Sequence, residues 1–152
     1  MTAKDLWNQF ITQKNLPDCE YDAWAFGVDP DMLAHLVLIG EKTATASAYP
    51  LYILEDEPLP TSDTYSVILD SNDNAVCVIK TSSVTVVPFD EVTAEYAFKE
   101  GEGDKSLSYW KKVHQSFFTE ELKDFGMQFT SDMKVVCEEF SVVYRHSADL
   151  NK

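Results

Sequence analysis

The sequence has few basic residues and almost no arginine. Its 152 residues include 12 lysines and arginines against 26 aspartates and glutamates, which gives a formal net charge of −14, and Arg145 is the only arginine. Proteins that bind long nucleic acids normally present a basic face, because neutralising phosphates supplies most of their affinity. We therefore expect no DNA partner, and a small or weakly charged ligand suits the composition better than a polyanion. Lys105, Lys111 and Lys112 could still form a local basic groove.

Cysteine clusters and long apolar segments are also missing. Cys19, Cys77 and Cys137 lie far apart, and no Cys-x-x-Cys or Cys/His cluster occurs, so we expect no metal site and predict no cofactor. The first residues lack the apolar core of a signal peptide. No apolar run approaches the roughly 18 residues of a transmembrane helix. These absences predict a cytoplasmic protein without a membrane partner.

What the sequence does contain is the composition of a globular domain. Hydrophobic residues make up 45% of the chain and aromatic residues 12%, which is enough for a sizeable core at this length. No internal repeat, low-complexity segment or linker divides the chain. We therefore predict a single domain over residues 1–152.

The N-terminal part predicts two helices with a loop between them. Apolar residues form one stripe of a helix at about residues 3–14, and the Asp-Pro-Asp sequence at 29–31 is typical of a helix start. The segment between them, residues 18–30, is predicted as an irregular aromatic loop. Its Trp24 and Phe26 either cover the core as a lid or form one wall of a ligand pocket.

Strand patterns follow. From residue 43 alanines alternate with small hydroxyl residues, Thr43 and Ser47 among them, and such a strand lets a ligand approach closely. The acidic, proline-rich residues 55–60 predict an exposed connection. Further strands are predicted at residues 65–69, 75–79, 84–87 and 134–144.

Two more helices lie before the last predicted strand. One is expected to begin at Asp90 and to end at Gly101, and the other to begin near Asp104. Helices at the start, scattered strands, two helices and a final strand are typical of an α+β domain with a small closed or half-closed barrel.

A lysine and a threonine at the predicted junction of helix and strand, Lys42 and Thr45, have the residue types of a base and a nucleophile. A lysine whose charged form is disfavoured by burial can take a proton from a nearby hydroxyl, which then attacks a carbonyl. Positions 42 and 45 would point to opposite faces of a regular strand, so this pair needs a bend between them. The alternative is a solvated lysine at a helix end and an ordinary strand threonine.

The sequence Glu-Gly-Glu-Gly-Asp at residues 100–104 places carboxylates on a glycine-rich turn. Glu100 would lie at the negative end of one helix, which raises a carboxyl pKa and favours the protonated acid. Asp104 would lie at the positive end of the next helix and stay ionised. Two carboxyls with opposed environments are typical of an acid/base pair. The alternative is a solvated acidic turn without a chemical role.

Three blocks of the sequence together resemble one protein family. They are residues 38–45, residues 87–92, and residues 100–107 with Trp110 and His114 beyond. In these blocks the chain resembles the ASCH domain proteins, a branch of the PUA-like superfamily, and it is similar to their longer bacterial subgroup over nearly its whole length. The resemblance implies a small PUA-like β-barrel with flanking helices, a cleft lined by the first block, and RNA or modified nucleotides as ligands.

The resemblance also implies an activity. Smaller members of the family are amidohydrolases that deacetylate N4-acetylcytidine with a lysine as proton acceptor, a threonine three positions later as nucleophile, and a glutamate as proton donor. Matched by motif, these roles fall on Lys42, Thr45 and Glu100. Substrate contacts are then expected from Trp24, Phe26, Thr43, Ser47, Glu102, Asp104, Trp110 and His114. The extra N-terminal helix and the EGEGD turn set this chain apart from the small enzymes, so the substrate can differ.

These observations support two functions of different classes. The first is an amidohydrolase on an acylated nucleoside, which the chemistry of the three side chains and the negative charge favour. The second is a non-catalytic RNA-binding module, or a weak ribonuclease, in RNA metabolism or translation. A cleft that binds another small molecule is a third hypothesis. Turnover of N4-acetylcytidine supports the first, and RNA binding that weakens with salt supports the second.

Overall fold

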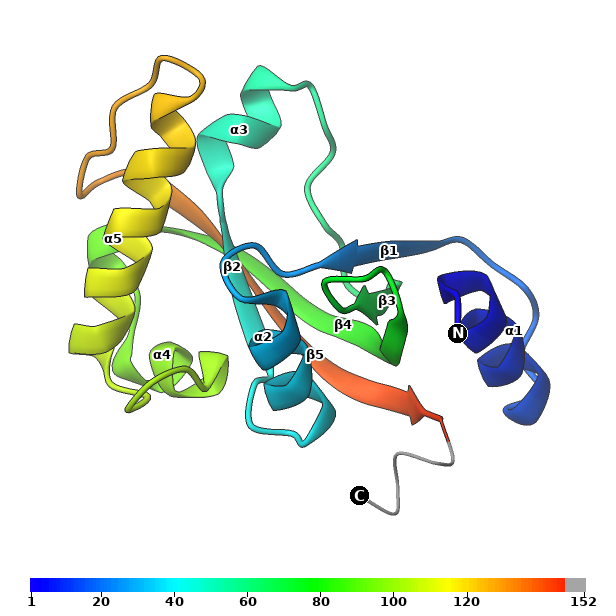
Figure 1. Cartoon of the computed structure of the whole chain (residues 1–152). Coiled ribbons are helices and arrows are strands. Elements are labelled where there is room, and N and C mark those ends of the chain that lie inside the picture. The colour runs from blue at the N-terminus through cyan, green and yellow to red at the C-terminus, as the bar shows by residue number, and fades with distance from the viewer. Residues whose placement is uncertain (147–152) are drawn as a thin grey trace.

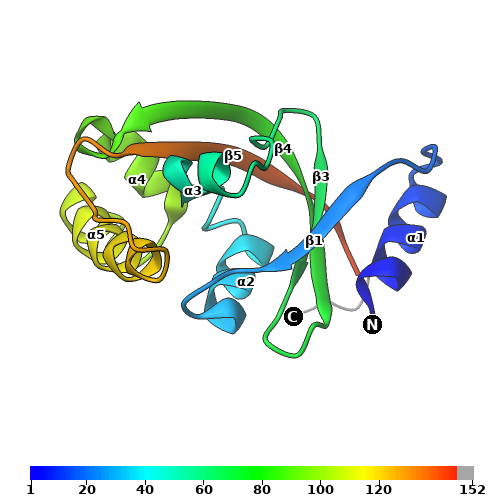
Figure 2. The same cartoon turned by 90° about the horizontal axis from the view of Figure 1, so that it is seen from above.

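The computed structural model describes residues 1–146, in which five strands form one mixed sheet. The strands follow the spatial order β1-β3-β4-β5-β2; they are β1 (Tyr21–Ala25), β2 (Ala44–Ala48), β3 (Tyr65–Leu69), β4 (Ala75–Pro88) and β5 (Lys134–Arg145). The sheet curves into a half-barrel (Figure 1, Figure 2). The predicted α+β class is therefore confirmed, and residues 147–152 of the predicted domain lie outside the described part.

Helices cover both ends of this sheet. They are α1 (Ala3–Gln13), α2 (Pro30–Leu38), α3 (Tyr49–Leu54), α4 (Ala94–Glu100) and α5 (Leu107–Lys123). α1 lies at one end of the sheet and α4 and α5 lie at the other (Figure 1). α1 begins where Thr2 and Asp5 form a capping box, and it buries Leu6, Trp7 and Phe10, which is the stripe that the apolar spacing predicts. Within residues 1–146 no helix is both long and apolar enough to cross a membrane.

The α4 helix begins later than predicted. Phe89–Glu91 form a short 3-10 turn, and Thr93 caps α4 in place of Asp90 because its hydroxyl accepts a hydrogen bond of 3.1 Å from the Tyr96 amide. The end of the helix is as predicted, at Gly101, which has a φ of +72°. The caps at Thr93 and Gly101 therefore place Glu100 at the last position of α4.

The two strands predicted at 75–79 and 84–87 are one strand. β4 pairs with β5 from Cys77 to Pro88, and the register shifts between Val78 and Ile79 and again between Thr81 and Ser83. Such a shift is a β-bulge, which absorbs an extra residue and bends the strand without ending the pairing. The polar segment at 81–83 therefore curves the sheet and does not interrupt it.

Two elements of the structure were not predicted. Tyr21–Ala25, expected within an irregular loop, forms the edge strand β1, which pairs in parallel with β3. Its alternation of polar and apolar residues is weak, because both faces of this short edge strand are largely exposed. Tyr49–Leu54, expected to lead into an exposed connection, forms α3 with Pro50 in its first turn, where the missing N–H leaves no helical hydrogen bond unmade.

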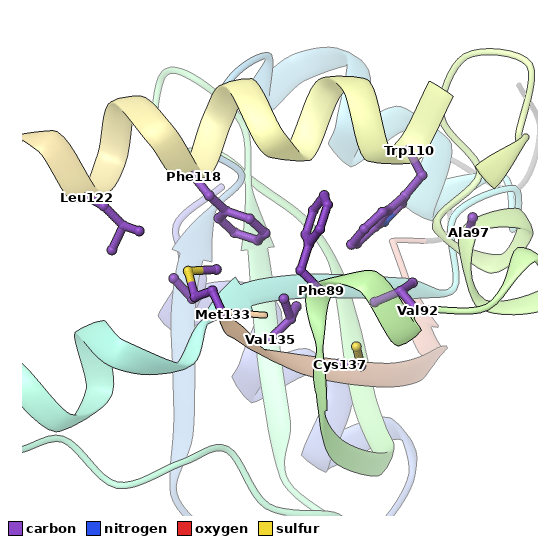
Figure 3. Packing of buried hydrophobic residues seen from close by; sticks show 10 residues of the cluster. Phe89, Val92, Ala97, Trp110, Phe118, Leu122, Met133, Val135 and Cys137 are labelled. Atoms are coloured by element: carbon purple, nitrogen blue, oxygen red, sulfur yellow. The ribbon is translucent and has the colours of Figure 1, made fainter. Parts of the chain in front are cut away.

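A cluster of buried side chains joins α4 and α5 to the sheet (Figure 3). The rings of Phe89 and Trp110 lie 5.3 Å apart, and Phe118 packs edge-on to Phe89 at 6.4 Å. Val135 and Cys137 cover the same cluster from β5. This packing fixes α5 against β2 and β5, and so it places the turn between α4 and α5 beside the start of β2.

Candidate active site

Lys42 is a buried cation whose hydrogen bonds all go to one acidic turn. Its Nζ lies 3.2 Å from Oε1 of Glu100, 3.3 Å from the Glu100 carbonyl oxygen and 2.9 Å from Oε2 of Glu102. These contacts match the three N–H donors of an ammonium. The side chains of Lys42 and Glu100 are only 1% and 2% exposed. The alternative of a solvated lysine at a helix end is therefore wrong.

Glu100 is held as a carboxylate. Besides Lys42, its Oε2 accepts a hydrogen bond of 2.5 Å from the Trp110 indole, and His114 Nε2 lies 3.4 Å from its Oε1. Burial alone raises the pKa of this carboxyl, but the Lys42 ammonium, with His114 and Trp110, lowers the pKa to about 2. The predicted rise was wrong, because the nearby cation outweighs the weaker field of the helix end.

The two aromatic residues that contact Glu100, Trp110 and His114, both belong to α5. The rings of Trp110 and His114, one turn apart, stack with centroids 4.2 Å apart. His114 Nδ1 lies 2.9 Å from the Trp110 carbonyl oxygen, so this nitrogen donates to it. This bond turns Nε2 of His114 toward Glu100. α5 therefore presents two side chains that orient one carboxylate.

A glycine brings the two segments together. Gly101 is buried, and a Cβ built on it would lie 2.0 Å from the Glu41 carbonyl oxygen. Only a residue without a side chain allows the turn after α4 to pass so close to residues 41–42. Lys105 also forms an ion pair with Glu41. The alternative of a solvated acidic turn is therefore wrong at Glu100 and Gly101, while Asp104 is exposed.

Thr45 lines the same cavity as Lys42 and Glu100. Lys42 precedes β2 and Thr45 is the second residue of that strand, so the strand alternation that would separate them does not apply. The backbone carbonyl of Thr45 accepts a hydrogen bond of 2.6 Å from the Tyr96 hydroxyl. The Thr45 hydroxyl itself makes no hydrogen bond to another residue among those described.

The cavity has a volume of about 350 Å³, which lies in the range of small-molecule sites. Apolar side chains make most of its wall, and β2, the segment before it, the last residue of α4 and the turn after α4 contribute Lys42, Thr45, Glu100 and Glu102. Lys42 Nζ also lies 5.4 Å from the centre of the Phe26 ring. The arrangement offers a hydroxyl, an ammonium and two carboxylates to a ligand held between hydrophobic walls.

Three of the predicted substrate contacts reach this cavity: Phe26, Glu102 and His114 line it. The other five do not. Trp24 packs edge-on to Phe26, and Trp110 lies buried behind Glu100. The three hydroxyl and acidic residues are engaged elsewhere: Thr43 bonds the Lys99 carbonyl, Ser47 bonds the Tyr52 hydroxyl, and Asp104 accepts from Ser106.

Several residues of the cavity wall were not predicted from the sequence. Met32 comes from α2, and Tyr109, Val113 and Phe117 come from α5. Those three recur every four positions and form a stripe beside the core stripe of Trp110 and Phe118. A second apolar stripe next to the core stripe was the signal in the sequence that a cavity borders this helix.

A metal ion fits this cluster poorly. Glu100, Glu102 and His114 offer ligand atoms within 4.8 Å of one another. Yet the Lys42 ammonium bonds both carboxylates, so a positive charge already lies among them. A divalent ion in this position would be repelled by the buried ammonium, and the donor set is better matched to Lys42 itself.

A family model described as ASCH domain matches residues 22–144. No curated protein matches the chain. A crystal structure of a protein from Enterococcus faecalis V583, described under the family model DUF984, is 33% identical, covers 98% of this chain and 92% of its own, and has a TM-score of 0.88.

Two further crystal structures carry the family's name. An ASCH domain from Lactobacillus crispatus JV V101 is 30% identical, with 93% of this chain and 94% of its own chain covered and a TM-score of 0.87. A mutant ASCH protein from Zymomonas mobilis is 11% identical, with 88% and 78% covered and a TM-score of 0.54. The last likeness concerns the fold alone.

Proposed function

The chain belongs to the ASCH domain family, and from this and the geometry of its cavity we propose that it hydrolyses the amide of an acylated nucleoside such as N4-acetylcytidine. One observation carries the proposal. The Lys42–Glu100 pair, whose two members lie 58 positions apart in the sequence, and Thr45 line one cavity of about 350 Å³. A nucleophile beside a proton-carrying pair is what amide hydrolysis requires.

In this mechanism Thr45 is the nucleophile. Its oxygen bonds to the acyl carbon, and the bond from that carbon to the base nitrogen breaks. The leaving nitrogen needs a proton, and the proton of the buried pair resides on Lys42, because Glu100 is held ionised. Lys42 therefore supplies the proton, either directly or through the hydrogen bond of 3.2 Å to Glu100.

In the second half of the reaction, hydrolysis of the acyl-threonine, Lys42 accepts a proton where it earlier donated one. After the amine has left, Lys42 is neutral and can accept a proton from the water that attacks the acyl-threonine. The family resemblance implies different roles, in which Lys42 accepts the proton of Thr45 and Glu100 protonates the leaving amine; the ionised Glu100 does not fit the second of these. Glu100 and Glu102 favour the return of the ammonium, because both accept hydrogen bonds from it.

The cavity favours an uncharged, flat substrate. Its walls include the aromatic rings of Phe26, Tyr109 and Phe117, and stacking on aromatic rings is the common way in which proteins hold nucleobases. Glu102 lines the cavity, and an acidic side chain there disfavours a phosphate nearby. A free nucleoside therefore suits the site better than a nucleotide.

The RNA-binding alternative has less support. Lys105, one of the three lysines that suggested a basic groove, is ion-paired with Glu41. Lys111 and Lys112 remain on α5, in a chain whose net charge is −14. Counterion release needs more free cations than these two residues supply.

The test is hydrolysis of N4-acetylcytidine by purified protein, with cytidine measured by chromatography. We expect turnover by the wild type and a loss of at least about 1,000-fold in Thr45→Ala, as for other covalent nucleophiles. Thr85→Ala, the same change at an exposed position of β4, is the control and should be fully active. No turnover by the wild type, or equal turnover by Thr45→Ala, would refute the proposal.

A further inference from the structure

The Thr45 hydroxyl needs a proton acceptor, and the charged Lys42 cannot be that group. Its N–H donors point at Glu100 and Glu102, and an ammonium has no lone pair. We propose that Glu138, on β5, accepts the proton when Thr45 attacks. This inference rests on the proposed role of Thr45 and adds a residue that the family motif does not contain.

The pairing of the strands places Glu138 beside Thr45. β2 and β5 are antiparallel, and Thr45 lies directly opposite Glu138 in their register. Directly opposed residues point to the same face of a sheet, with Cβ atoms about 4.5–5.5 Å apart. The two side chains are therefore neighbours, although 93 positions separate them along the sequence (138 minus 45).

Of these two residues, Thr45 lines the cavity and Glu138 does not. Phe140, two residues after Glu138 on β5, packs into the cluster that contains Phe26 and Val37, and residues two apart on a strand share a face. Phe26 also lines the cavity. Cys137, on the opposite face, packs beneath α5 instead. Glu138 therefore lies on the face of the sheet that carries Thr45 and Phe140, next to the cavity wall that Thr45 forms.

The surroundings of Glu138 make it a better base than an ordinary carboxylate. Burial, followed by the charge of Asp22 on β1, raises its pKa to about 7. Tyr52 of α3, whose hydroxyl bonds Ser47, lies near enough that the charge of Glu138 contributes to raising the Tyr52 pKa, after burial of the Tyr52 side chain. Among residues 1–146 no lysine, arginine or histidine forms an ion pair with Glu138. A general base is most effective when its pKa lies near the working pH.

With Glu138 as the proton acceptor, every proton in the reaction is accounted for. In acylation the Thr45 proton passes to the Glu138 carboxylate, and the Lys42 ammonium protonates the leaving nitrogen. In deacylation a water molecule attacks the acyl carbon, its proton passes to the neutral Lys42, and Glu138 returns its proton to the Thr45 oxygen. The sum is amide plus water giving carboxylic acid and amine, with every residue restored.

An activated ester isolates the first of these steps. With 4-nitrophenyl acetate the leaving group is a stable phenolate that needs no proton, so acetylation of Thr45 depends on its base and not on Lys42. The acetyl group is counted by mass spectrometry and the nitrophenolate by absorbance. We expect one acetyl group on Thr45 in the wild type, none in Thr45→Ala, and at least about 100-fold slower acetylation in Glu138→Gln. Glu139→Gln, the same change at the next residue, which pairs with Lys99 on the other face, should keep the wild-type rate.

The pH dependence separates a base from a merely structural carboxylate. The wild-type acetylation rate should fall as the pH drops through about 7, where Glu138 takes up a proton, and Glu138→Gln should lose this inflection. Asp22→Asn removes a charge that raises the pKa of Glu138, so its inflection should move to lower pH. Asp22 is exposed on an edge strand, so this variant gives a result even if Glu138→Gln does not fold.

The results of these experiments test the role of Glu138 separately from the identity of the substrate. Acetylation of Thr45 that depends on Glu138, without hydrolysis of N4-acetylcytidine, would support Glu138 and refute the substrate. Wild-type acetylation rates in Glu138→Gln, or an unmoved inflection in Asp22→Asn, would overturn the role of Glu138. A wild-type protein that never acetylates Thr45 would overturn it as well, together with Thr45 as the nucleophile.

Discussion

The Lys42 Nζ atom lies 3.2 Å from Oε1 of Glu100, although 58 positions separate the two residues. Both side chains are almost fully buried, so each charge depends on the other to offset the loss of water. The pair joins the start of β2 to the end of α4. It thereby sets the position of the cavity end at which Thr45 lies.

Replacing Lys42 by methionine should destabilise the protein strongly. The substitution keeps the volume but leaves the Glu100 carboxylate without its cation, and breaking one half of a buried pair costs about 3–5 kcal/mol. Urea unfolding monitored by tryptophan fluorescence measures the change. Lys105→Met, which removes the half-exposed pair with Glu41, should cost no more than about 1 kcal/mol. Similar losses in the two variants would contradict the importance of the buried pair.

The stability of the protein should fall in acid in a way that depends on Glu100. Its pKa is about 2 in the folded protein against 4.5 for an unperturbed group. Because the folded pKa is the lower one, the ionised form contributes stability that is fully present above about pH 4.5 and disappears as the pH falls toward 2. The difference corresponds to roughly 3 kcal/mol.

Glu100→Gln is the comparison for this prediction. The variant should be less stable than the wild type at pH 6, and its free energy of unfolding should change less between pH 6 and pH 3. Other carboxylates titrate in both proteins, so only the difference between the two slopes reports on Glu100. Parallel slopes would show that this carboxylate is not held ionised.

Replacing Gly101 by alanine should push the turn after α4 away from residues 41–42. The new Cβ would lie 2.0 Å from the Glu41 carbonyl oxygen, and the φ of +72° is itself unfavourable for alanine. Gly40→Ala is a matched control, because Gly40 has a φ of +83° but open space around the new atom. We expect a loss of about 1–2 kcal/mol at Gly40 from the backbone conformation alone, and a clearly larger loss at Gly101. Thermal unfolding measures both, and equal losses would argue against close contact between the segments.

Removing the Tyr109 ring should weaken substrate binding more than chemistry. Tyr109 lines the cavity and lies across Gly103, where its ring can stack on a nucleobase. One stacked base contributes about 1–3 kcal/mol, so Tyr109→Ala should raise the KM for N4-acetylcytidine by about 5- to 150-fold with a smaller change in kcat. Tyr109→Phe retains the ring and should behave like the wild type. A fall in kcat at unchanged KM would instead place Tyr109 in the reacting centre.

Local sequence patterns were sufficient for much of the fold. The extents of α1 and α2 and the C-terminal end of α4 follow from caps, periodicity and glycine, all of which act within a few residues. β1 and α3 were missed because their evidence is not local. β1 is a short edge strand that is defined by its pairing with β3, and α3 has no buried residue among those described.

The sequence by itself determined which chemical groups this protein has: a lysine and a threonine three positions apart, a glutamate before a glycine, and a chain too acidic to suit a polyanion. Only the tertiary structure decided how those groups are charged. Glu100 is ionised because Lys42, Trp110 and His114 surround it, and Glu138 lies beside Thr45 because β2 and β5 pair in one register. Protonation depends on distances of a few ångströms between segments far apart in the chain, and no local pattern encodes those distances.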